Sequence, residues 1–206
     1  SRGRNVVLCG AQDVEAQVLA AALNHLLGNE GRTVDLENPS LQAQGDDAAL
    51  EGLFSELRAG KVGALFILRA NPVFDLPWGG ELAGLIKKLP LAVSLAAHDD
   101  ETAEFCEFLA PPSHPLETWG DAEPRDGVVS LSQPATGPLG NTRSFSESLA
   151  SWSGTPGTAL ELLRGAWRKD VHPRAGGGAS FQSFWDETLE RGFARVSARA
   201  GKPGAF

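Results

Sequence analysis

The sequence predicts an α/β fold, in which a Rossmann-like, doubly wound and mainly parallel sheet with helices on both faces is followed by a helical C-terminal extension. Short apolar runs alternate in the first half of the chain with segments whose apolar residues recur at helical spacing. The runs lack polar alternation, which is typical of parallel strands buried on both faces. For a chain of 206 residues we expect a Rossmann-type domain at residues 1–152 and a helical docking segment at residues 153–206.

The order of elements follows from the apolar pattern and from the residues that stop it. Strands are expected where the runs are short and continuous, at residues 5–9, 33–36, 62–68 and 91–95. Helices are expected where the apolar period is helical, at residues 14–26, 46–60, 82–89 and 101–108. The pattern does not give the order of the strands within the sheet.

The second half of the chain has a different composition. Residues 111–143 are rich in Pro and Gly and predict a long ordered loop with one strand at residues 128–132. Apolar residues at helical spacing then predict helices at residues 144–152, 160–167 and 181–189, and residues 170–178 are interpreted as a linker. We expect the aromatic residues of these helices to form docking surfaces, because they repeat at helical spacing.

Composition excludes several classes of protein. The formal charge of −8 argues against a nucleic-acid backbone binder, and no apolar run is long enough to cross a membrane. Two cysteines, Cys9 and Cys106, are too few to ligate zinc or an iron–sulfur cluster by themselves, and whether they pair is open. The chain starts without Met and contains none, so we expect a piece of a longer protein or a processed one.

Candidate chemistry lies where the strands end, because ligands of open parallel sheets bind beyond the carboxyl ends of the strands. Four loops qualify, at residues 10–12, 37–39, 69–72 and 98–102. Gly10 could let backbone amides approach a phosphate, or could simply make a tight turn, and the chain has neither GxGxxG nor GxxxxGK.

Two of these loops allow two interpretations each. The Asn71 amide could hydrogen-bond a base edge, or Asn71 and Pro72 could only shape the loop. The run from His98 to Glu101 could be a metal or acid–base site. Alternatively, Asp99 or Asp100 caps the following helix and Glu101 lies in its first turn, which is the commoner use of acidic residues there.

An ordered set of short motifs resembles the third domain of the molybdopterin oxidoreductase superfamily. The set spans residues 5–152 and includes the Asn71–Pro72 turn, Glu101-Thr-Ala103 and Glu117. Further matching stretches are Ala22 to Asn29 with Gly31, Leu109 to Pro111, Gly127 to Pro134, Pro138-Leu139 and Arg143. The resemblance implies a Rossmann-like sheet that would contact a molybdopterin guanine dinucleotide through Gly10, Asn71, Asp99, Glu101 and Thr102.

Departures from the pattern point to one branch of this superfamily. Cys106 and Glu107 replace the usual Ala-Asp, and Ala110 interrupts the usual Leu-Pro. Trp119 and the aromatic tail resemble the large iron–sulfur subunit of bacterial alternative complex III, a quinol-oxidising respiratory complex. That branch is thought to lack the pterin and its metal, which agrees with strand-end loops that carry one arginine, Arg69, among several carboxylates.

We therefore carry three hypotheses. The first is a non-catalytic structural domain, without cofactor or metal, of a membrane-associated electron-transfer complex; whether the chain is an enzyme stays open. Its partners would be the other domains and subunits, and the resemblance implies the outer, periplasmic face of the bacterial cytoplasmic membrane, without direct insertion. The second is a genuine molybdopterin guanine dinucleotide-binding domain of a molybdenum or tungsten oxidoreductase. The third is an unrelated flavodoxin-like nucleotide or flavin module, disfavoured by the absence of a Ser/Thr-rich phosphate loop after the first strand.

Overall fold

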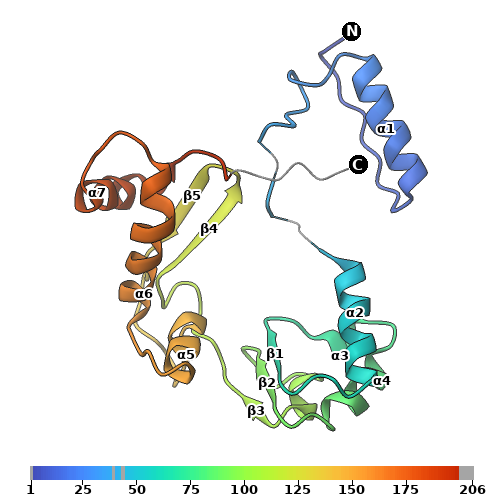
Figure 1. The fold of residues 1–206 in the computed structure, drawn as a ribbon, viewed down its shortest axis with the longest axis vertical. Helices are drawn as coiled ribbons and strands as arrows, with labels where there is room; N and C mark the ends of the chain where they lie inside the picture. Colours follow the sequence, from blue (N-terminus) through green and yellow to red (C-terminus); the bar gives the residue numbers. More distant parts are fainter. Residues whose placement is uncertain (1, 39, 43–44, 200–206) are drawn as a thin grey trace.

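The computed structural model describes residues 2–38, 40–42 and 45–199 of the chain. It contains a three-stranded parallel sheet and a separate three-stranded antiparallel sheet, each with its own helices (Figure 1). Pro39, in the second predicted strand-end loop, and residues 200–206, at the end of the predicted C-terminal extension, lie outside the described residues. The α/β class and the parallel sheet predicted from the sequence are confirmed.

The parallel sheet has the strand order β1-β2-β3. Its strands are β1 (Leu65–Leu68), β2 (Ala92–Leu95) and β3 (Phe108–Leu109). The helices of this half are α2 (Asp47–Arg58), α3 (Pro72–Asp75), α4 (Gly79–Ile86) and the 3-10 turn η1 (Ala103–Phe105). Asp46 caps α2 by accepting a hydrogen bond from the Ala49 amide, and Gly60, with φ of 66°, follows its end.

The core of this half lies on one face of the sheet. Phe54 and Leu57 of α2 pack with Leu82 and Ile86 of α4 against Ile67 of β1, and all five are buried. Burying an aliphatic or aromatic side chain of this size stabilises the fold by roughly 1.5–3 kcal/mol. These contacts fix α2 and α4 on the same face and hold β1 beside β2.

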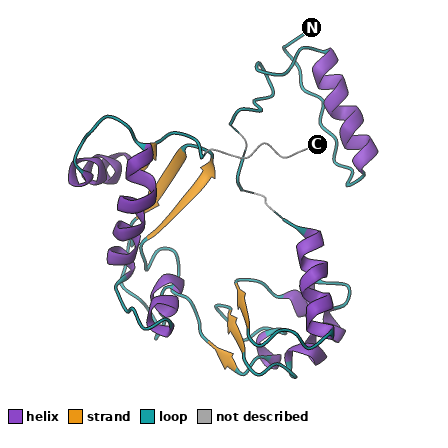
Figure 2. Ribbon diagram, viewed as in Figure 1, coloured by secondary structure: helices purple, strands orange, loops and turns teal. Residues whose placement is uncertain are grey.

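The antiparallel sheet has the order β4-β5-β6 and belongs to the second half of the chain. Its strands are β4 (Gly120–Arg125), β5 (Val128–Ser132) and β6 (Phe193–Arg195). The helices beside it are α5 (Phe145–Trp152), α6 (Ala159–Ala166), the π-helical turn η2 (Trp167–Val171), the 3-10 turn η3 (His172–Arg174) and α7 (Phe181–Arg191). Figure 2 shows α6 and α7 beside the long β4–β5 hairpin, with α5 beyond its end.

An aromatic core holds this second half together. Trp167 and Trp185 are 0% and 1% exposed and meet edge to face, with ring centroids 5.5 Å apart. Around them lie Val129 of β5 and Ala194 of β6, both buried. The Trp167 indole also donates a hydrogen bond to Asp121 of β4, at 2.7 Å, so the helices are tied to the sheet by a directional contact as well.

The N-terminal segment consists of an extended stretch, residues 5–9, and α1 (Val14–Leu26). Figure 1 shows this segment apart from the parallel sheet, at the opposite end of the molecule. Residues that follow it contact β4 instead: Asp35 forms an ion pair with Arg125 at 2.6 Å, and the Leu41 amide donates to the Pro124 carbonyl. The larger apolar residues of α1 stay exposed, and they are Val14, Val18, Leu19, Leu23 and Leu26.

Several predicted elements need correction. Residues 5–9 and 33–36 were expected to be strands of the main sheet, but they form none, because no described strand lies beside them to supply a ladder. The end of the predicted helix 101–108 is strand β3, and the predicted loop 111–143 contains β4 as well as the expected β5. The predicted linker 170–178 is helical as far as Arg174.

The predicted helices at residues 14–26, 46–60, 82–89, 144–152, 160–167 and 181–189 are confirmed within a few residues at their ends. The division into domains at residues 152 and 153 stays a prediction. Strand β6 pairs with β5 across that division. In the described part of the chain no helix has the length and apolar character needed to cross a membrane.

Candidate functional site

The strand-end loops of β1 and β2 meet through side-chain hydrogen bonds. The two strands run parallel in register, with Leu68 beside Leu95, so both carboxyl ends lie at one edge of the sheet. The Asn71 amide group donates to a Glu101 carboxylate oxygen at 2.7 Å. The Thr102 hydroxyl donates to the Asn71 amide oxygen at 2.7 Å. We call Asn71, Glu101 and Thr102 the strand-end clasp.

Thr102 lies at the centre of the clasp. Its side chain is fully buried, and its hydroxyl also accepts a hydrogen bond from the Val73 amide at 3.1 Å. One hydroxyl therefore connects the start of α3 with the turn that follows β2. A buried hydroxyl in both roles has its hydrogen-bonding capacity largely used within the protein, so it holds the two loops together.

The acidic run beside the clasp is largely a capping arrangement. One carboxylate oxygen of Asp100 accepts from the amides of Thr102 and Ala103, at 3.1 and 2.8 Å. Asp100 thus takes the capping role that the sequence allowed for Asp99 or Asp100. Glu101 is exposed, and its hydrogen bond with Asn71 is the main cause that lowers the pKa of its carboxyl group. The lowered pKa keeps the Glu101 carboxyl group anionic at neutral pH.

The Cys106 thiol lies behind the clasp. Its Sγ donates to the Thr102 carbonyl at 3.5 Å, and burial, followed by the nearby charge of Asp100, raises the pKa of the thiol. A raised pKa leaves little thiolate at neutral pH, so Cys106 is a poor nucleophile and a poor metal ligand. Neither Cys9 nor Cys106 forms a disulfide.

The structure brings together only some of the predicted contacts of the dinucleotide. Asn71, Glu101 and Thr102 touch one another, and Asp99 lies exposed in the same loop. Gly10 lies in the N-terminal segment, which Figure 1 shows away from β1 and β2. Whether any of these five residues binds a cofactor stays a prediction.

A cavity of about 450 Å³ with a mixed polar and apolar lining opens beside the end of β1. Arg69 lies at its rim, and residues of the β4–β5 hairpin and the start of α5 complete the lining. Arg69 has φ of 50°, which makes it the single non-glycine residue with a left-handed backbone within the described ranges. Such a conformation is uncommon for a long side chain and often marks a constrained site.

Sequence reasoning missed this cavity because its residues come from distant segments. Several of its hydroxyl groups are engaged: Ser113 contacts Thr142 at 3.1 Å, Ser130 donates to a backbone carbonyl, and Ser144 closes the capping box of α5. The charged side chains of the lining are Arg69, which could attract an anion, and Asp121, which accepts from the Trp167 indole. The described residues contain no group of three or more His, Cys, Asp and Glu side chains placed to hold a metal ion.

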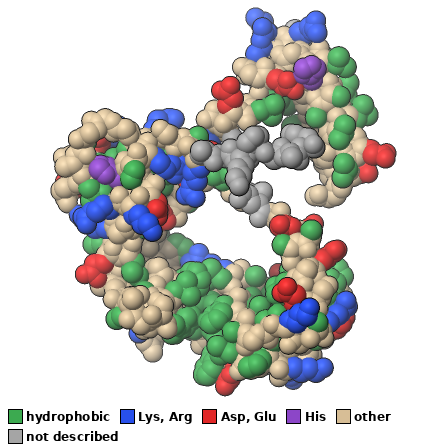
Figure 3. All heavy atoms as spheres, in the orientation of Figure 1, with side chains coloured by type: hydrophobic (Ala, Val, Ile, Leu, Met, Phe, Trp, Pro, Cys, Tyr) green, Lys and Arg blue, Asp and Glu red, His purple; other side chains and the backbone are tan. Residues whose placement is uncertain are grey.

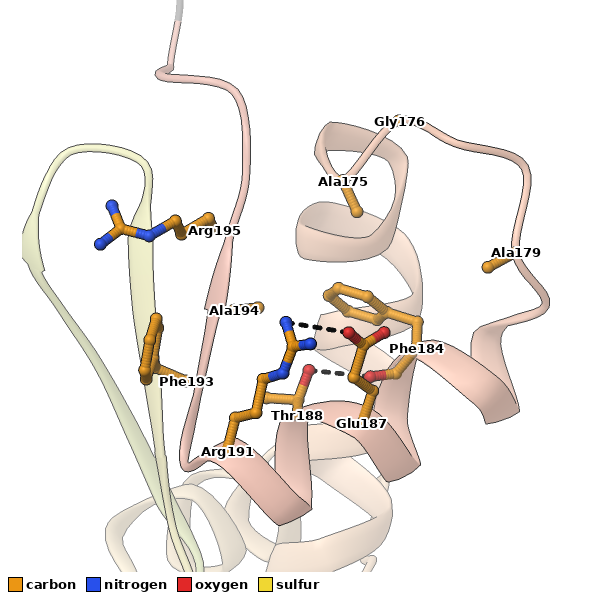
Figure 4. A pocket seen from close by; sticks show the side chains of 10 residues that line it. All are labelled: Ala175, Gly176, Ala179, Phe184, Glu187, Thr188, Arg191, Phe193, Ala194 and Arg195. Carbon is orange, nitrogen blue, oxygen red and sulfur yellow. Dashed lines mark hydrogen bonds and ion pairs between the residues drawn. The ribbon is translucent and has the colours of Figure 1, made fainter.

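A second cavity, of about 290 Å³, lies between α7 and β6 (Figure 4). The polar side chains that α7 contributes to this cavity bond to other groups of the same helix. Glu187 and Arg191 form an ion pair at 2.9 Å, and the Thr188 hydroxyl donates to the Phe184 carbonyl at 2.8 Å. The remaining lining is mainly small or aromatic. This cavity therefore offers packing space rather than a reactive centre.

Comparison with known proteins gives one sequence relative and a fold neighbour. The chain is 31% identical over 140 residues to the menaquinone reductase, molybdopterin-binding-like subunit, of Nitratidesulfovibrio vulgaris Hildenborough. The match covers 66% of this chain and 20% of that subunit, so the chain spans about one fifth of the relative's length. No protein-family model matches the chain.

One of the solved structures with a similar fold is acetylene hydratase from Pelobacter acetylenicus. Its structure superposes with a TM-score of 0.56 and 17% identity, over 74% of this chain and 21% of that one. This similarity concerns the fold alone. Together the two comparisons confirm the predicted resemblance to molybdopterin oxidoreductases at the level of distant homology. The finer assignment to the alternative complex III branch stays a prediction.

Proposed function

We propose that this chain is a molybdopterin-oxidoreductase-like structural domain within a larger subunit of a respiratory, quinone-linked electron-transfer complex. The observation that carries the proposal is its distant homology to the molybdopterin-binding-like subunit of a menaquinone reductase. The function we infer is to hold neighbouring electron-transfer parts in place, without a catalytic step in this domain.

The strand ends support a domain without a bound pterin dinucleotide. A pyrophosphate needs converging backbone donors or cations. The clasp instead uses the Asn71 amide and the Thr102 hydroxyl to join two loops of the protein. The Glu101 carboxyl group beside them has a pKa lowered by its hydrogen bond with Asn71, and its negative charge, unlike a cation, would repel a phosphate. These residues do not fit the dinucleotide, so no reaction step is assigned to it.

The alternative is a genuine molybdopterin guanine dinucleotide-binding domain. The cavity beside β1 favours it, since its lining includes the cation Arg69. In that case Asn71→Ala should weaken the binding of GDP, a probe for the nucleotide end, in calorimetric titration of the chain. A variant that binds GDP as the parent does, or the absence of binding in both, would count against this alternative.

The finer assignments are part of the same proposal. We infer a complex that resembles alternative complex III, in which the domain lies peripherally at the outer face of the cytoplasmic membrane. Its partners would be the other domains and subunits, docked in part through exposed aromatic residues such as Trp152 and Phe193. We also infer that the parallel sheet is part of a doubly wound sheet with helices on both faces.

The decisive experiment uses the parent complex purified from its native host. Molybdenum and tungsten are measured by mass spectrometry, and pterin by the fluorescence of its oxidised form. We expect neither at stoichiometric amounts in a preparation that transfers electrons to or from quinone. Stoichiometric metal and pterin would overturn the structural role. Comparing quinol oxidation with menaquinone reduction in that preparation gives the direction of electron flow.

A further inference from the structure

We propose that α6 and the π-helical turn η2 present a docking surface for an acidic segment of a partner protein, whose carboxylates bind Arg164, Arg168 and Lys169. We call these three residues the basic face. The inference rests on the proposed structural role and deepens it, because it gives the chemistry of one contact with a neighbouring domain or subunit. The distribution of charge, the aromatic rings beneath the arginines and the lack of internal partners point to it.

The charge of the chain is unevenly distributed along the sequence. Residues 159–206 hold eight of the 18 Lys and Arg residues but only five of the 26 Asp and Glu residues. This stretch is therefore positive in a chain whose formal charge is −8. Figure 3 shows several Lys and Arg side chains on the part of the molecule that holds α6 and α7. A positive surface on an acidic protein attracts acidic partners and sets the orientation in which they bind.

Aromatic rings support the two arginines of the basic face. The Cζ atom of Arg168 lies 4.7 Å from the ring centroid of Phe181. The Cζ atom of Arg164 lies 5.0 Å from that of Trp185. Phe181 is itself held between Trp185 and His172, with ring centroids 5.9 and 5.7 Å away. A guanidinium stacked on a fixed ring keeps N–H groups free at its edge and loses little freedom when it binds.

This support changes the role of the aromatic residues in the C-terminal helices. The sequence predicted that they form docking surfaces. Trp167 and Trp185 are instead buried in the core of the antiparallel half, and Phe181 is half buried. The groups that reach the solvent above these rings are the arginines. Arginine is enriched with aromatic residues at the centres of protein interfaces.

The basic face has no acidic partner within the described part of the chain. Arg174, in the same half, is held by two carboxylates. Arg164 donates to the neutral side chain of Gln182 at 2.7 Å. Arg168 and Lys169 form neither an ion pair nor a side-chain hydrogen bond with the residues that the structure describes. Their charges are therefore available to carboxylates from outside the chain.

The π-helical turn holds these charges in fixed positions. η2 follows α6 directly and contains both Arg168 and Lys169. Trp167 and Val171, at the two ends of η2, are 0% and 6% exposed and fix it to the core. Turns of this kind are rare and occur frequently at functional sites. Cations on a rigid element bind carboxylates with less loss of freedom than cations on a loop.

The number and setting of the charges favour a protein over a membrane surface. Segments that bind anionic lipids use clusters of about four to eight Lys and Arg residues. The basic face has fewer, Arg164 is half buried, and the exposed Asp170 follows Lys169 directly. A planar guanidinium fits the two oxygens of a carboxylate through paired hydrogen bonds, which suits a small number of discrete contacts.

Carbodiimide cross-linking in the parent complex, purified from its native host, tests the contact. The reagent joins a lysine amine to a carboxylate that touches it and leaves no spacer. Lys169 is the amine of the basic face, and Lys61, also exposed, at the end of α2, is the control. We expect peptide mass spectrometry to find Lys169 joined to an Asp or Glu outside residues 1–206. Its yield should exceed that of Lys61 by at least about tenfold, because contact gives a high effective concentration.

Two matched variants test the centre of the basic face. Arg168→Lys keeps the charge and adds a reactive amine. Arg58→Lys makes the same change at an arginine that also lies over a ring, 4.2 Å from the centroid of Phe54, but pairs with Glu81 at 2.7 Å. We expect position 58 to link to Glu81 within the chain and position 168 to link to an Asp or Glu outside it. Unchanged Tm values verify that both variants fold.

The proposal is overturned if Lys169 and position 168 give no link, or link only to carboxylates within residues 1–206. Equal yields from Lys169 and Lys61 would also overturn it. These outcomes concern the basic face alone, whereas metal and pterin content tests the structural role, so the two can fail separately.

Flotation with anionic vesicles separates a protein partner from a membrane. The full chain and its Arg168→Gln variant are mixed with vesicles of phosphatidylglycerol and phosphatidylcholine at physiological salt. We expect neither protein to float with the vesicles. Flotation of the parent chain that Arg168→Gln abolishes would overturn the protein partner and assign the basic face to lipid headgroups.

Discussion

The two sheets of this protein differ in how completely they are covered. The antiparallel sheet packs against the helices of its own half, and Trp167 and Trp185 are almost wholly buried between sheet and helices. The parallel sheet buries one face under α2 and α4 but leaves Phe66 and Phe108 of the other face exposed, together with the free edge of β1. The core of the antiparallel half is fully covered, whereas that of the parallel half leaves apolar side chains and one sheet edge exposed.

The difference also bears on function. Candidate ligand-binding loops belong to the incompletely covered sheet, where the clasp joins β1 to β2. In the cavity between α7 and β6 of the covered sheet, Glu187 and Arg191 pair with each other and the Thr188 hydroxyl is bonded within the helix. A domain that serves as a scaffold needs a rigid core and exposed surfaces that contact its neighbours. The antiparallel half supplies the rigid core, and the parallel half supplies exposed apolar surfaces.

The largest expected effect is in the covered half. Trp185→Ala removes a side chain that is 1% exposed and contacts Trp167, so the free energy of unfolding should fall by roughly 3–5 kcal/mol. Trp152→Ala, at a tryptophan that is 49% exposed, should cost about 1 kcal/mol. Urea unfolding followed by circular dichroism measures both.

Hydrogen exchange sharpens this comparison. If the two halves have separate cores, Trp185→Ala should increase exchange in β4 and β5 and leave β1 and β2 unchanged. An equal increase in both sheets would mean that the chain unfolds as one unit, and the contrast between the halves would then be only a difference in packing.

The next effect is a pH dependence that arises from an ion pair in the covered half. Glu123 is 10% exposed and pairs with Arg174 at 2.5 Å, and hydrogen bonding from Arg174 is the main cause that lowers its pKa from 4.5 to about 2. A pKa depressed in the folded state adds stability above the unfolded value, and that stability is lost as the pH falls from 4.5 toward 2. The shift corresponds to about 3 kcal/mol.

Glu123→Gln isolates this contribution from that of the other carboxyl groups. Arg174 keeps its charge throughout the window, since pairing with Glu123 raises its pKa further. Urea unfolding of the parent and of the variant should differ most near pH 6 and converge toward pH 2. A difference in stability that stays constant from pH 6 to pH 2 would contradict the role of the Glu123 charge.

The sequence predicted the elements better than their assembly. Helix ends followed local signals, such as the Asp46 cap and the Ser144 capping box, so α2 and α5 appear where expected. The second sheet was not predictable, because it pairs β5 with β6 across some sixty residues, and β4 reads as Gly120-Asp-Ala-Glu-Pro-Arg125, with little β propensity. Local patterns do not encode pairings of that kind.

The candidate site was likewise predictable only in part. Strand-end position was enough to single out Asn71, Glu101 and Thr102, and the structure joins them. Sequence could not tell that Asn71 bonds to Glu101 rather than to a ligand, since an amide serves either purpose. Nor could it foresee the positive φ of Arg69 or the cavity at its side, which depend on tertiary packing.

A smaller effect concerns the clasp of the parallel half. Thr102→Val keeps the volume of a fully buried side chain but leaves the Val73 amide and the side-chain amide oxygen of Asn71 without their partner. The free energy of unfolding should fall by about 1–3 kcal/mol, and Thr102→Ser, which restores the hydroxyl, should recover most of it. Thermal unfolding of the three proteins measures the difference. Equal losses for Val and Ser would show that the methyl group matters and the hydrogen bonds do not.

The smallest effect separates two glycines of one helix in the parallel half. A Cβ at Gly79, the first residue of α4, would collide with the Val73 carbonyl, so Gly79→Ala must displace α3 and should cost about 1–3 kcal/mol. Gly84 lies in the interior of the same helix, and a Cβ there meets open space. Gly84→Ala should therefore raise the free energy of unfolding by about 0.5–1 kcal/mol, because alanine loses less backbone freedom on folding.

The opposite signs make this pair a direct test of how closely α3 packs on α4. Urea unfolding of both variants against the parent gives the two differences under identical conditions. If Gly79→Ala also raises the free energy of unfolding, then α3 can move away from α4 without loss of stability. The parallel half would then be loosely packed even on the face that α2 and α4 cover. If the signs differ as expected, that side is rigid, and the incomplete packing of this half is confined to the free edge of β1 and the face beyond it.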